Sequence, residues 1–80
     1  MDDTRLLGQR VYKAAQIVFN GRRAAIDCVV RNLSDKGALL QVASPLGIPE
    51  TFDLVCGDAM IRPCHVLWWK EKHIAVEFQR

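Results

Sequence analysis

Short apolar segments alternate with polar turns along the chain, and within the segments the pattern has a period of two residues. In the second segment, Ile26, Cys28 and Val30 fall on one face of an extended chain. Asp27 and Arg31 fall on the other face. One apolar and one polar face are typical of a β-strand that covers a small core. No segment shows a sustained period of 3.6 residues, so the sequence predicts an all-β fold.

Turn-forming residues divide the chain into six such segments. Asn20-Gly21 is a strong signal for a two-residue hairpin turn. The stretch 44–49 contains two prolines and a glycine, which exclude regular structure. The six predicted strands are 11–19, 23–31, 38–43, 51–55, 60–69 and 74–78. Short strands joined by tight turns favour a closed six-stranded antiparallel β-barrel, which leaves no exposed sheet edge.

The fifth segment ends in two adjacent tryptophans. Strict alternation places Trp68 on the face of the core-facing Cys64 and Trp69 on the opposite face. The pattern therefore predicts one indole ring in the core and the other at the surface.

The length and composition indicate a single soluble domain. All 80 residues are assigned to it, with residues 1–9 as a flexible arm and residues 10–79 as the barrel. Half of the residues are hydrophobic, but no apolar run approaches the roughly 20 residues of a membrane span, and no leader begins the chain. The sequence thus predicts a cytoplasmic protein without a membrane partner.

The charge, the cysteine content and the lack of catalytic pairings argue against nucleic-acid-binding proteins, metalloproteins and enzymes. The net charge of +2 is too small to favour nucleic acid, although a small anionic ligand needs only two or three cations. Cys28, Cys56 and Cys64 form no Cys-x-x-Cys motif and do not stand at metal-ligand spacing from His65 or His73. We expect free thiols, no metal and no cofactor. No nucleophile–base pairing is visible, so we expect no enzymatic activity.

The stretch 31–37, Arg-Asn-Leu-Ser-Asp-Lys-Gly, separates two predicted strands. Asn32 and Ser34 can each fold a side-chain oxygen back onto the local backbone, and Gly37 is expected to supply a positive φ. A purely structural hairpin loop explains this composition. The spacing Asn-x-Ser-x-x-Gly after a strand that ends in arginine also resembles the second signature of PilZ domains, small cytoplasmic β-barrels that bind cyclic di-GMP.

The resemblance extends from about Arg10 to Phe78, with further similar stretches at 44–49 and 62–68. In PilZ domains, an Arg-x-x-x-Arg pair before the first strand and the loop signature after the second strand grip the nucleotide together. The loop signature is complete here. Of the arginine pair only Arg10 is present, because Leu6 stands four residues earlier and Arg5 is one position out of register.

The resemblance implies a binding site for cyclic di-GMP. Arginine bonds bidentately to phosphate or to the guanine edge, asparagine oxygen accepts from guanine N–H, and serine hydroxyl reaches phosphate or base. One missing charge-assisted contact costs ~1.5–3 kcal/mol, so we expect weaker binding than with a full arginine pair. The implied ligand-binding residues are Arg10, Asn32, Ser34 and Gly37, with Arg5 and Arg31 as auxiliary contacts.

Three functional classes follow from these observations. The first is a cyclic di-GMP receptor whose N-terminal arm signals occupancy to a downstream protein partner. The second is a PilZ-like adaptor that has lost the nucleotide and acts through its surface. The third is a small nucleic-acid-binding barrel, suggested only by the mild positive charge and an exposed tryptophan. The sequence lacks a basic face studded with aromatic residues, so we expect no nucleic-acid partner.

Overall fold

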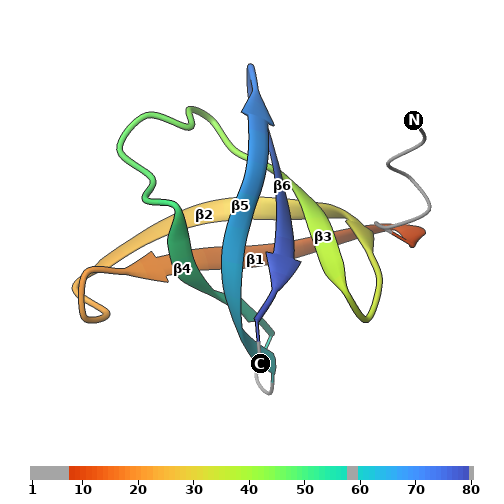
Figure 1. Ribbon diagram of the computed structural model, residues 1–80, viewed down its shortest axis with the longest axis horizontal. Coiled ribbons are helices and arrows are strands. Elements are labelled where there is room, and N and C mark those ends of the chain that lie inside the picture. The colour runs from red at the N-terminus through yellow and green to blue at the C-terminus, as the bar shows by residue number, and fades with distance from the viewer. Residues whose placement is uncertain (1–7, 58–59, 80) are drawn as a thin grey trace.

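The computed structural model, which describes residues 8–57 and 60–79, confirms the all-β fold (Figure 1). Every predicted strand is present, with ends within two residues of the prediction. The prediction ended the arm at residue 9, but Gln9 already belongs to the first strand, and residues 1–7 lie outside the described residues. The strands are β1 (Gln9–Phe19), β2 (Ala24–Leu33), β3 (Gly37–Gln41), β4 (Thr51–Cys56), β5 (Met60–Lys70) and β6 (His73–Phe78).

The six strands form a closed barrel in the order β1-β2-β3-β6-β5-β4, and each neighbouring pair is antiparallel. β1 and β2 form the longest hairpin, which wraps across the molecule (Figure 1). A short ladder closes the barrel, in which residues 16–18 of β1 pair with residues 53–55 of β4. Among the described residues, no helix is long and apolar enough to cross a membrane.

The core consists of the inward-facing residues of all six strands, as alternation along the strands requires. Cys28 and Val30 of β2 are buried, as predicted, and Ile26 packs against the same core from a half-buried position. The largest fully buried side chains are Ile17, Val30, Leu40, Leu54, Cys64, Ile74 and Val76.

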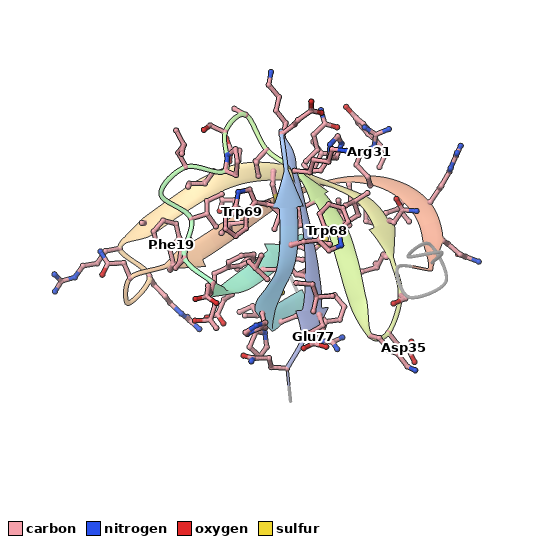
Figure 2. All side chains as sticks on the ribbon, turned by 45° about the horizontal axis from the view of Figure 1, so that its top comes forward. Phe19, Arg31, Asp35, Trp68, Trp69 and Glu77 are labelled. Atoms are coloured by element: carbon pink, nitrogen blue, oxygen red, sulfur yellow. The ribbon has the colours of Figure 1, made fainter. Side chains whose placement is uncertain are left out.

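The predicted placement of the two tryptophans was wrong. A β-bulge lies between Val66 and Trp68, so Trp68 pairs with Ala75 and Trp69 pairs with Ile74. The extra residue of the bulge shifts the alternation by one position beyond it. Both rings reach solvent, with Trp68 37% and Trp69 62% exposed. In Figure 2 they lie on opposite sides of β5.

The turn between β1 and β2 is longer than the predicted two residues. Phe19 pairs with Ala24, so the loop contains the four residues 20–23. The backbone N–H of Arg23 donates to the carbonyl of Asn20 at 3.2 Å. Asn20, Gly21 and Arg22 all have positive φ, and this run of left-handed residues reverses the chain.

Candidate functional site

A row of five residues crosses the outer face of the barrel from β1 to β5. Each member is the direct cross-strand partner of the next, and directly paired residues share a face of the sheet. Ala75 lies between the core residues Ile74 and Val76 of β6, which places the row on the outside. We call these residues the outer row: Arg10, Asn32, Leu39, Ala75 and Trp68.

The outer row changes from polar to apolar along its length. Arg10 is exposed and provides a cation at one end, next to the half-buried amide of Asn32. Leu39 is half-buried and Ala75 is buried, and the indole of Trp68 completes the other end. A cation and an amide on the same outer face as a partly exposed indole suit a ligand that combines phosphate with a planar base.

Arg31 lies beside the polar end of the outer row, where the strands are irregular. One β-bulge interrupts the pairing of β2 with β1 at Arg31, and a second interrupts the pairing of β2 with β3 at the same residue. Its Nη1 donates to Oε1 of Gln41 at 2.6 Å, and its guanidinium carbon lies 5.5 Å from the centroid of the Tyr12 ring. These contacts hold an exposed cation on the outer surface, as Figure 2 also shows. Bulges commonly redirect a side chain in this way.

Ser34 organises the turn that follows β2. Its Oγ accepts hydrogen bonds from the backbone N–H groups of Lys36 and Gly37, both at 3.1 Å. The N–H of Ser34 donates to the carbonyl of Gly37 at 2.9 Å. The serine therefore has the turn-forming role that its position in the sequence predicts. Its half-buried hydroxyl fixes the loop between Asn32 and β3.

The expected positive φ at Gly37 was wrong. Gly37 begins β3, pairs with Glu77 and does not have a positive φ. A glycine is required here because a Cβ atom would overlap the carbonyl oxygen of Val76 on the neighbouring strand. The constraint is thus a close approach of two backbones.

Gly8 connects the N-terminal arm to this loop. It has a φ of 72°, and a Cβ atom on it would overlap the carbonyl of Leu33 and lie 2.6 Å from Cβ of Ser34. The chain therefore enters the barrel directly against the loop signature. Sequence reasoning missed this residue, although its position two residues before Arg10 was a signal. The proposed contact residue Arg5 lies outside the described residues.

A second arginine approaches the loop from β5. The guanidinium carbon of Arg62 lies 4.2 Å from the centroid of the Phe78 ring, and its Nη2 donates to the backbone carbonyl of Asp35 at 3.5 Å. Arg62 faces the inner side of the barrel end, because its partner Leu54 is a core residue. Its hydrogen bond to Asp35 supports the loop from the inner side of the barrel end. The sequence pattern did not single out Arg62.

The three cysteines are free, and two of them are buried. Burial raises the pKa of Cys28 to about 12, and burial likewise raises the pKa of Cys64 to about 12. Both thiols therefore stay protonated at neutral pH and are poor nucleophiles and metal ligands. Within residues 8–57 and 60–79, no group of three or more His, Cys, Asp or Glu side chains could hold a metal ion.

These thiols predict a loss of stability in alkali. The pKa of each is 9.0 ordinarily and about 12 when folded, so above pH 9 the unfolded chain releases thiol protons that the folded chain retains. The two protonated thiols therefore contribute fully to the free energy of unfolding below pH 9. This contribution is lost as the pH rises toward 12. We expect the urea midpoint to fall between about pH 8 and about pH 10.5, and to fall less in Cys28→Ala and Cys64→Ala. An equal fall in all three proteins would assign the effect to other groups.

The sequence matches no protein-family model and no curated protein.

Proposed function

We propose that the protein is a binding module for cyclic di-GMP, without catalytic activity, whose ligand lies on the outer row beside the loop 31–37. The observation that carries this proposal is the direct pairing of Arg10 with Asn32. These two residues are 22 positions apart in the sequence and belong to the two halves of the motif. The register brings them together on one outer surface, next to the turn that Ser34 organises.

The chemistry of each group suits one part of the ligand. In this proposal the Arg10 guanidinium binds a phosphate or a guanine edge, and the Asn32 oxygen accepts from a guanine N–H. Ser34 and Gly37 shape the loop that faces the nucleotide, and in this proposal the Ser34 hydroxyl contacts a phosphate or a base. Arg31 contributes positive charge at the rim. A base stacks on the partly exposed indole of Trp68 in this proposal.

The arm links the proposed site to signalling. Gly8 packs on Leu33 and Ser34, so the chain enters the barrel beside the proposed ligand. Ordering of the arm by the ligand would then change the surface that a downstream protein partner meets in the cytoplasm. Leu6, in place of the first arginine, favours the alternative of an adaptor that has lost the nucleotide.

Titration calorimetry of the whole chain with cyclic di-GMP tests the proposal. We expect measurable heat at ligand concentrations up to about 1 mM, together with NMR shifts of the Asn32 and Gly37 amides and the Trp68 indole. Cyclic di-AMP is the control, because it keeps the phosphates and lacks the guanine edge. Absence of both heat and shifts would replace this function with that of the adaptor.

Restoring the missing arginine should strengthen binding. Leu6→Arg recreates the four-residue spacing to Arg10, and we expect a gain of roughly five- to fifty-fold in affinity. Part of the new interaction energy is spent in ordering the arm, and the gain should shrink at high salt. Arg5→Ala is the matched control, since it weakens the parent only if Arg5 already contacts the ligand. If Leu6→Arg has no effect and Arg5→Ala abolishes binding, the arm follows a different register.

A further inference from the structure

A cavity of 210 Å³ opens at one end of the barrel, between the loop 45–50 and the strands β5 and β6. Its inner wall includes the core residue Ile74 and the half-buried Val66. Trp69 lines it too, and this residue pairs with Ile74 on the inner side of the sheet but is 62% exposed. The cavity therefore runs from solvent at Trp69 to the core at Ile74. The mouths of β-barrels are common places for small-molecule sites.

The loop that forms the outer wall of the cavity is fixed by hydrogen bonds. The N–H of Ile48 donates to the carbonyl of Pro45 at 3.3 Å, and Gly47, with a φ of 84°, provides the left-handed residue of this turn. At the end of the loop, the carbonyl of Glu50 accepts from the N–H of Val66 at 2.7 Å and attaches the loop to β5. The cavity is thus largely preformed, which lowers the cost of binding a ligand.

The lining of the cavity combines apolar groups with a negative charge. Of the described residues that line it, Glu50 alone is charged, and this residue is exposed. Lys70 follows Trp69 in β5, so alternation directs it to the outer face of the sheet. Lys72 lines a neighbouring groove. A carboxylate and an indole ring both attract an organic ammonium group.

The volume limits the size of the occupant. A closed cavity of ~150 Å³ admits one benzene molecule, so 210 Å³ accommodates one aromatic ring and about two further carbon atoms. We propose that the cavity binds a small arylalkyl ammonium compound, whose ring contacts Val66 and Ile74 and whose ammonium group lies at the mouth beside Glu50 and Trp69. The depth of the cavity favours a small molecule, because a flat protein surface would leave the space against Ile74 unfilled.

This site is separate from the proposed nucleotide site. Trp69 borders the cavity, whereas Trp68 belongs to the outer row, and the two rings lie on opposite sides of β5 (Figure 2). Cyclic di-GMP should therefore not compete with the ammonium compound. Failure of either function would leave the other testable.

NMR titration of the whole chain with 2-phenylethylammonium tests the proposal. We expect a dissociation constant of about 1 mM or below, as is usual for a ligand of this size in a preformed site. The methyl groups of Ile48, Val66 and Ile74 and the indole of Trp69 should shift, and the indole of Trp68 should shift much less. The uncharged analogue 2-phenylethanol should bind about fivefold more weakly.

Substitutions at the mouth separate the contribution of charge from that of the ring. Glu50→Gln should weaken 2-phenylethylammonium about fivefold and leave 2-phenylethanol within about twofold. Trp69→Ala should weaken both compounds about fivefold or more, since it removes part of the wall. Glu71→Gln is the matched control, because it makes the same charge change at an exposed residue that does not line the cavity. It should leave both affinities within about twofold. Circular dichroism verifies that each variant is folded.

Three results would overturn the proposal. The first is a dissociation constant above about 1 mM for 2-phenylethylammonium. The second is equal affinity for the charged and the uncharged compound, or an equal effect of Glu50→Gln and Glu71→Gln. The third is a set of shifts that is largest on the outer row, which would place the ammonium compound at the proposed nucleotide site.

Discussion

Replacing Gly37 with alanine is expected to destabilise the barrel by about 3 kcal/mol or more, as measured by urea unfolding. The new Cβ would overlap the carbonyl oxygen of Val76, and this oxygen belongs to the backbone of β6. A flexible side chain could move aside at little cost, but here two paired strands must separate. Because a small domain has a total stability of only about 5–15 kcal/mol, a large part of the population should unfold at moderate temperature.

Gly21→Ala separates this steric cost from the ordinary cost of losing a glycine. Gly21 has a φ of 64°, but no atom lies within 4 Å of its added Cβ. Its replacement should therefore cost only about 1 kcal/mol, the usual penalty for a left-handed alanine. If Gly37→Ala is no more harmful than Gly21→Ala, β3 and β6 can separate at this point without loss of the fold.

The strands could be predicted from the sequence because their inward faces alternate clearly. In β2, the buried positions Cys28 and Val30 follow this period, and both were assigned correctly. The same rule failed for Trp68 and Trp69. The bulge beside them adds one residue to β5, and nothing in the local composition marks it. Alternation therefore predicts which face of the sheet a residue occupies only up to the next β-bulge along the strand.

The candidate site could be predicted only in part, for a related reason. Asn32 and Ser34 belong to a local turn, and local turn chemistry is visible in a sequence. The requirement for glycine at position 37 comes from β6, nearly 40 residues further along the chain. The contact of Arg62 with the loop and the outer row likewise depend on how distant strands pair. Such pairings follow from closure of the whole barrel, which no local pattern encodes.

Among the substitutions at the proposed site, loss of the Arg10 guanidinium is expected to reduce the affinity for the ligand the most. We expect Arg10→Ala to weaken binding of cyclic di-GMP about ten- to a hundredfold in calorimetry, because one charge-assisted contact typically provides ~1.5–3 kcal/mol. Arg10 is exposed on the outer face of β1, so its truncation should change the unfolding free energy by less than about 0.5 kcal/mol. The loss of affinity should therefore occur in a folded protein. Arg10→Lys should retain the salt-dependent attraction and lose the bidentate geometry, giving an intermediate affinity.

Arg22→Ala is the matched control, since it removes an exposed arginine from the far end of the same hairpin. It should leave the affinity unchanged at moderate salt, where distant charges are screened. Equal effects of the two substitutions would mean that the ligand responds only to total charge. An unchanged affinity in Arg10→Ala, combined with a loss in Trp68→Ala, would move the nucleotide to the aromatic end of the outer row. The pairing of Arg10 with Asn32 would then have only a structural role.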